Sequence, residues 1–145
     1  MKKLIVIKGE LPTLNDYTKV NRGNKYVGAR AKKLATIVCE MATKEAMSKG
    51  LTVETPFSIT CHWYTKNNRK DHDNVAFGIK FIQDGMMAAG LMENDGPKQV
   101  GNIHHLFQVD KDNPRVEVEI WDAEDIEGKT VPEAYEKYEA RSSKQ

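Results

Sequence analysis

Arg69–Asp95 reads RKDHDNVAFGIKFIQDGMMAAGLMEND and forms the centre of the chain. Asp73 and Asn74 are good helix-capping residues, and Gly90 is the next break in the pattern. Between them, apolar residues recur at spacings of three and four and predict one buried helical stripe: Val75, Ile79, Ile82, Met86 and Ala89. At about 100° per residue, a second face collects Asp73, Phe77, Lys80 and Asp84. The pattern therefore predicts one helix that presents two carboxylates and an ammonium in a row, with Asp71 just before it.

Strand and helix patterns on either side of this segment predict the remaining elements. Short β-branched or period-two runs predict four strands, at residues 3–8, 52–65, 99–109 and 115–121, the last two joined as a hairpin around DKDNP. Ala31–Ser48 has the apolar spacing of an amphipathic helix. Glu10–Tyr26, interrupted by proline, asparagine and glycine, is expected to be a long loop. This order predicts a single α+β domain with a mixed β-sheet and two main helices.

Size and composition are those of an ordinary soluble domain. The chain has 145 residues, of which 39% are hydrophobic and 30% charged. Residues 1–122 are expected to form the domain, and residues 123–145 an acidic, polar tail. The apolar run near the N-terminus has four residues, too few for a signal peptide or a membrane span, so we expect a cytoplasmic protein without membrane contact. Cys39 and Cys61 have no metal-ligand spacing and are expected to be reduced thiols.

The charges are distributed unevenly although the net charge is only +1. Residues 1–70 contain 14 Lys and Arg against 5 Asp and Glu, and residues 71–145 contain 8 against 16. This asymmetry favours a basic surface for a polyanion beside a carboxylate cluster for a cation, although chance plus an acidic tail is the alternative. Basic, amide and aromatic groups suited to nucleic-acid phosphates and bases are Asn15, Tyr17, Lys19, Arg22, Lys25, Arg30, Arg69 and Lys70.

The string D-x-D-N occurs twice, and the two copies have different surroundings. Asp110–Asn113 lies in the predicted turn before Pro114, where aspartate and asparagine are favoured for turn formation alone. Asp71–Asn74 lies between a predicted strand and a predicted helix with further charges along one face. Turn formation does not explain those further charges, so the first copy is the candidate site.

Several kinds of metal site are excluded by the residues present. An EF-hand would need an oxygen ligand at Val75 and a glycine at Ala76. A zinc site would need cysteine and histidine at closer spacings, and His62, on the polar face of a half-buried strand, is expected to be solvated. The remaining possibility is a carboxylate site for Mg²⁺ or Mn²⁺ in a phosphodiesterase, with Lys80 beside the phosphate. A salt-bridged helix face is the alternative.

Three segments of the chain resemble a known family. The string K-D-H-D-N, a helix with K-F-I-Q-D-G, and A-G-L-M-E-N-D-G are similar to the Holliday-junction resolvases of the RusA type, including their phage and prophage versions. The strand at the N-terminus followed by L-P-T-L-N-D-Y agrees with them, and the similarity extends from about Lys3 to Trp121. Two positions differ from the shorter version of the family's motif. In that version the lysine lies closer to the asparagine than Lys80 lies to Asn74 here. Asn94 stands where that version has a second aspartate, beside the one matched by Asp95.

The resemblance implies a role for individual residues. Asp71, Asp73 and Asp95 match the metal-binding carboxylates, and Lys80 matches the catalytic lysine, so that these four would be the catalytic residues. Asn74 matches an asparagine that caps the helix or holds the aspartates in place, and Asp84 matches a further acid of the helix. The implied activity is Mg²⁺-dependent cutting of four-way or branched DNA by paired symmetric nicks in recombination and repair.

The resemblance also implies a homodimer, because two active sites match a two-fold substrate. The apolar end of the predicted central helix is a candidate for the contact surface between the two copies, and it consists of Met86, Met87, Leu91 and Met92. Packing inside the domain explains these residues equally well, so the position of the contact stays open. Two alternatives to the resolvase stay open. One is a metal-dependent nuclease for flaps or duplex DNA, and the other is a relative that binds junctions without cutting them.

Overall fold

The computed structural model describes residues 3–23 and 25–122, and the side chains of residues 20–27 are not described. The predicted tail at 123–145 therefore lies outside the described residues. The elements, in chain order, are β1 (Leu4–Lys8), α1 (Leu14–Gly23), α2 (Lys25–Ser48), β2 (Phe57–Thr65), α3 (His72–Ala76), α4 (Ile79–Ala88), β3 (Val100–Val109) and β4 (Arg115–Asp122). Within the described ranges, no helix is long and apolar enough to cross a membrane.

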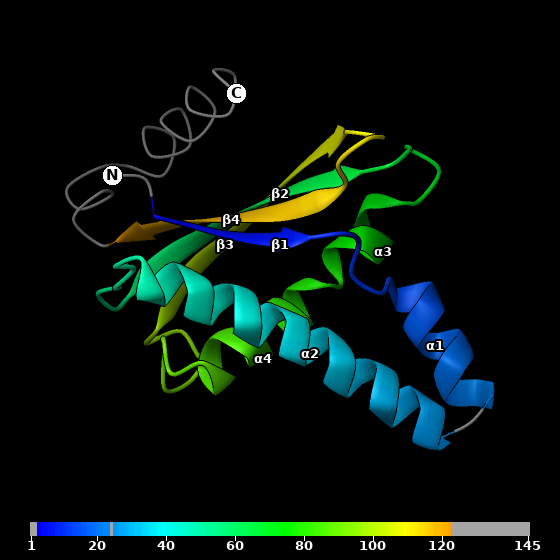
Figure 1. Ribbon diagram of the computed structural model, residues 1–145, viewed down its shortest axis with the longest axis horizontal. Coiled ribbons are helices and arrows are strands. Elements are labelled where there is room, and N and C mark those ends of the chain that lie inside the picture. The colour runs from blue at the N-terminus through cyan, green and yellow to red at the C-terminus, as the bar shows by residue number, and fades with distance from the viewer. Residues whose placement is uncertain (1–2, 24, 123–145) are drawn as a thin grey trace.

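The predicted α+β domain with a mixed sheet is confirmed (Figure 1). The four strands lie in the order β1-β4-β2-β3; β4 is antiparallel to both of its neighbours, and β2 is parallel to β3. The predicted hairpin of the last two strands is wrong, because β2 lies between them. The turn itself is as predicted: the Asn113 N–H donates to Asp110 Oδ1 at 3.3 Å.

The connection from β3 to β4 passes over the end of β2. Its five residues, 110–114, must cover two strand spacings of about 4.8 Å each, which is well within the roughly 17 Å that five extended residues can span. The Asp110 N–H donates to the carbonyl of Thr65, the last residue of β2, at 2.8 Å. A short turn between two strands thus does not require the strands to pair, and local sequence cannot distinguish the two cases.

Helices α2 and α4 pack against one face of the sheet (Figure 1). Alternating residues of β2 belong to this core, since Phe57, Ile59, Cys61 and Trp63 are all buried. The opposite face of β2 is also buried, so the prediction of a half-buried strand is wrong. His62 is only 2% exposed instead of solvated, and its Nε2 lies 3.1 Å from Glu119 Oε1 on the adjacent strand β4.

The predicted loop at Glu10–Tyr26 is wrong, because α1 begins at Leu14 and α2 begins at Lys25. Thr13 and Asp16 form a reciprocal cap at the start of α1: the Asp16 N–H donates to Thr13 Oγ1, and the Thr13 N–H donates to Asp16 Oδ2, both at 3.2 Å. Such a pair satisfies two backbone donors that have no partner within the helix. The Thr-x-x-Asp signal was present in the sequence and outweighs the neighbouring proline and asparagine.

The predicted central helix is divided into α3 and α4 at Gly78. A Cβ at Gly78 would lie 2.9 Å from Cη2 of Trp63, so only glycine allows this approach to the sheet. The hydrogen bonds tighten there, with the N–H of Gly78 donating to Val75 O and the N–H of Lys80 donating to Phe77 O. Contact with Trp63, which is distant in sequence, explains the break.

Gly85 lies where α4 crosses α2, and Gly85→Ala is expected to destabilise the fold by about 1–3 kcal/mol. A Cβ there would lie 2.5 Å from Cys39 Cβ and 2.7 Å from the Cys39 carbonyl carbon, so the two helices would have to move apart. The cost of moving the helices apart outweighs the roughly 1 kcal/mol by which alanine stabilises a helix relative to glycine. Urea unfolding measures the loss. Gly101→Ala, whose Cβ would have no neighbour closer than 3.6 Å, is the control and should change stability by less than about 0.5 kcal/mol.

Candidate metal and nucleic-acid site

Asp71 is the N-cap of α3, two residues earlier than the cap predicted at Asp73. Its backbone is extended, and its carbonyl accepts the N–H of Val75 at 3.1 Å. Its side chain makes no capping hydrogen bond. The carboxylate of Asp71 is exposed at the start of the helix and is not used to hold the helix together.

Asp73 lies in the first turn of α3 and is also exposed. Its Oδ1 accepts a hydrogen bond from the backbone N–H of Asn74 at 3.0 Å. Asn74 therefore helps to position Asp73 through its backbone. The second oxygen of Asp73 has no hydrogen bond within the described ranges. Two carboxylates, on either side of His72, thus face solvent at the start of one short helix.

The two copies of D-x-D-N differ in their partners. In the second copy, Asp110 Oδ2 accepts a hydrogen bond from Arg115 Nη1 at 2.8 Å and is neutralised by it. Across residues 3–23 and 25–122, the site aspartates Asp71, Asp73 and Asp95 make no ion pair, although basic residues precede the first of them. Their charge is therefore available to a cation from solution.

The single charged row expected of one helix is divided, because Asp73 lies on α3 whereas Lys80 and Asp84 lie on α4. Lys80 is exposed in the first turn of α4, beyond the break at Gly78. Asp84 is half-buried near α2: burial, and secondarily the charge of Asp84, raise the pKa of the Cys39 thiol to about 12. In the part of the chain that the structure describes, Lys80 and Asp84 make no ion pair with each other, so the alternative of a salt-bridged helix face receives no support from this pair.

Asp95 lies on the segment after α4 and is exposed. Its backbone N–H donates to Oδ1 of Asn94 at 2.9 Å, so Asn94 shapes this segment. Among the described residues, no three His, Cys, Asp or Glu side chains are grouped as ligands of one metal ion. The oxygen donors of Asp71 and Asp73 nevertheless fit magnesium chemically, because Mg²⁺ binds through one or two carboxylates and takes its other ligands from water and substrate phosphate.

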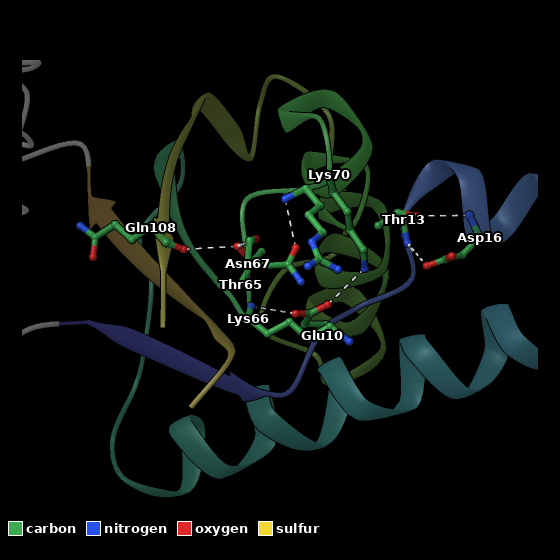
Figure 2. Close-up of polar contacts among 9 residues, drawn as sticks. Glu10, Thr13, Asp16, Thr65, Lys66, Asn67, Lys70 and Gln108 are labelled. Carbon is green, nitrogen blue, oxygen red and sulfur yellow. Dashed lines mark hydrogen bonds and ion pairs between the residues drawn. The ribbon is translucent and has the colours of Figure 1, made fainter. Parts of the chain in front are cut away.

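The basic turn before Asp71 is held by Glu10, which follows β1. Figure 2 shows Glu10 between Lys66 and Lys70: Oε1 accepts the Lys66 N–H at 3.0 Å, and Oε2 pairs with Lys70 Nζ at 3.2 Å. Burial alone would raise the pKa of Glu10, but these two partners outweigh it and leave the pKa below its ordinary value. The partners lie more than fifty residues apart in sequence, so no sequence pattern could identify Glu10.

A hollow of about 160 Å³ adjoins this turn. Lys70, His72 and Phe107 are among its lining residues, and the ring of His72 stacks on that of Phe107 with centroids 3.9 Å apart. Cationic, amide and aromatic groups together suit contact with a nucleotide. His72 and Phe107 were not among the predicted nucleic-acid contacts, and their proximity depends on the pairing of β2 with β3.

The predicted nucleic-acid contacts are placed unequally. Asn15 and Lys19 are exposed on α1, Arg30 is exposed on α2, and Arg69 is exposed in the basic turn. Tyr17 instead packs its ring against those of Phe77 and Phe81, at centroid distances of 5.5 and 6.3 Å, and has a structural role here. The side chains of Arg22 and Lys25 lie outside the described ones.

A comparison of this chain with known protein-family models and with curated protein sequences finds no match.

Proposed function

We propose that this protein is a Mg²⁺-dependent endodeoxyribonuclease that resolves Holliday junctions and other branched DNA in recombination and repair. The observation that carries the proposal is the contrast between the two D-x-D-N strings. In the second string, Asp110 is used in a turn and an ion pair, whereas Asp71, its counterpart in the first string, is exposed and makes no ion pair among the described residues. Asp71 and the equally exposed Asp73 directly follow a basic turn.

In this proposal, Asp71, Asp73 and Asp95 hold the metal, and Mn²⁺ is the natural substitute for Mg²⁺. The bound ion would activate the attacking water and stabilise the departing oxygen. Lys80, exposed on α4, stabilises the charge that develops on phosphate. Asn74 holds Asp73 through its backbone N–H, and Asp84 is a further acid of α4 whose charge acts on Cys39 of α2.

The proposed DNA surface consists of the basic turn with Arg69 and Lys70, together with the exposed polar residues of α1. Contacts to phosphate position the DNA without reading its sequence, which suits an enzyme that recognises the shape of a junction. We propose a homodimer acting in the cytoplasm, because a two-fold enzyme can cut two opposed strands of a two-fold junction.

A cleavage assay tests this function. The substrates are a four-way junction, a flap and a linear duplex, each with Mg²⁺, with Mn²⁺ and with a chelator. The proposal expects metal-dependent, paired cuts that are fastest on the junction. Faster cutting of the flap or duplex would favour the simpler nuclease, and junction binding without cutting would identify a non-cutting relative.

Lys80→Ala is expected to lower the rate of junction cleavage far more than it weakens junction binding. The physical reason is that a group that stabilises only the transition state contributes to turnover and not to the binding of the substrate. Single-turnover cleavage and a binding titration on one preparation separate the two quantities. Lys111→Ala, a change at an exposed lysine in the second D-x-D-N string, is the control. Near-normal turnover by Lys80→Ala would remove the lysine from the catalytic group.

Glu10→Gln is expected to strengthen the salt dependence of DNA binding. The glutamine keeps an oxygen that accepts the Lys66 N–H but no longer neutralises Lys70, so one more cation faces phosphate. The slope of log K against log salt should steepen by about one unit for each added phosphate contact. Titrations at several salt concentrations measure the slope, and an unchanged slope would show that Lys70 does not contact DNA.

A further inference from the structure

The outer face of α2 carries an apolar stripe that remains exposed. The exposed fractions are 57% for Leu34, 37% for Ile37, 46% for Val38 and 65% for Met41. On the opposite side of the same helix, Ala35, Cys39 and Thr43 are buried. Helix α2 therefore has two apolar faces, and among the described residues only one of them is buried in the domain.

The stripe is a continuous packing surface and not a scatter of single residues. Its members are spaced by three, one and three residues, which places them along one side of a helix. Within residues 3–19 and 28–122, the other large exposed apolar side chains lie on different elements: Val6 on β1, Leu14 on α1, and Ile103 and Val109 on β3. Contiguous exposed apolar surface of this kind marks an interaction site.

The charges at the ends of the stripe indicate what covers it. Arg30 lies one turn before Leu34, and Glu45 lies one turn after Met41. Glu45 also pairs with Lys49 at 3.2 Å, but both side chains are largely exposed, so this ion pair is weak. The stripe thus runs from a positive end to a negative end.

We propose that this stripe binds the same stripe of a second copy of the chain, with the two α2 helices antiparallel. About a two-fold axis between Ile37 and Val38, each Leu34 meets Met41 of the second copy, and each Arg30 meets Glu45. A parallel arrangement would instead place each charge against its own kind. A two-fold interface must be self-complementary, and the antiparallel arrangement satisfies this for both shape and charge. The inference names the surface for the homodimer of the proposed function and rests on that part of it.

The helix end predicted as an alternative contact surface is not free for this role. Met86 is fully buried and Met92 is 5% exposed, while Met87 and Leu91 pack against the same core. Their apolar surface is used internally. Of the helices that the structure describes, α2 thus carries the larger exposed apolar surface.

The test measures the mass of the full chain by light scattering and sedimentation equilibrium. The wild type is expected to have about twice the chain mass of 16.4 kDa. Met41→Glu should weaken the dimer by roughly thirtyfold or more, because it places a charge in the apolar stripe opposite Leu34 of the second copy. The control is Val109→Glu, which changes an equally apolar residue, 55% exposed on β3, and should leave the dimer intact. Circular dichroism and thermal unfolding verify that each variant is folded.

A charge exchange tests the antiparallel orientation. Arg30→Glu and Glu45→Arg should each weaken the dimer, because each brings like charges together, and the double variant should restore it. Weakening without restoration would overturn the orientation. A dimer insensitive to Met41→Glu would overturn the α2 surface while leaving the homodimer. A wild-type monomer would overturn both, and the junction-cleavage assay would still decide the nuclease activity separately.

Discussion

Asp73→Asn is expected to abolish junction cleavage while the protein stays folded and still binds the junction. Asn keeps an Oδ1 that accepts the N–H of Asn74, which is the one hydrogen bond that the Asp73 side chain makes within the described ranges. What is lost is a negative oxygen ligand, and magnesium depends on charged oxygen donors. The rate should fall by at least about a hundredfold, since losing even an outer partner of a metal costs 10–100-fold. Junction affinity should stay equal or increase, because a negative charge near phosphate is removed.

The chain contains a matched control for this variant. Asp112 occupies the same position in the second D-x-D-N string and is also exposed. Asp112→Asn makes the same chemical change in a turn and should leave cleavage at the wild-type rate. Both variants are measured over a range of Mg²⁺ concentrations. Wild-type cleavage by Asp73→Asn at saturating Mg²⁺ would remove the basis of the proposed metal site.

A supercoiled plasmid with an extruded cruciform is expected to give linear product as its first product. The cruciform is lost after a single nick because supercoiling is released, so linear DNA arises only when both opposed strands are cut in one binding event. One active site cannot reach both strands, so this outcome requires two protomers held together. Gel analysis at early times distinguishes linear product from nicked circles.

Met41→Glu provides the comparison in this assay. If α2 forms the dimer, a monomeric variant with intact Asp71 and Asp73 should give nicked circles in place of linear DNA. Linear product from the variant, at concentrations where it is monomeric, would show that paired cutting does not need this dimer. Nicked circles from the wild type would favour a simple nuclease over a resolvase.

The sequence predicted those parts of the fold that depend on local patterns. The strands, the helix of the α2 region and the turn at Asp110–Asn113 follow from periodicity and from residues with strong turn preferences. The reciprocal cap of Thr13 and Asp16 is also local, but the prolines and asparagines around it favoured a loop. The break at Gly78 and the placement of β2 between β3 and β4 depend on contacts between distant segments, and no local pattern encodes them.

The candidate site was predictable to the same extent. The exposure of Asp71 and Asp73 at a helix start follows from a short string of residues, and the structure places both there. The roles of Glu10 and His72 depend on segments that meet only in the folded domain. Metal ligation by Asp71, Asp73 and Asp95 stays a prediction, and among the described residues these three are not grouped as a closed metal cage.

The sheet order has a consequence for synthesis on the ribosome. β1 is the first strand to emerge, yet its neighbour in the sheet is β4, which ends at Asp122. Until β4 has left the ribosome, β1 has no strand to pair with, and β2 lacks one of its two neighbours. Such long-range pairing delays folding and leaves strand edges open to other chains meanwhile. The domain is thus expected to fold late in translation, as one unit, once β4 enters between the two strands made long before it.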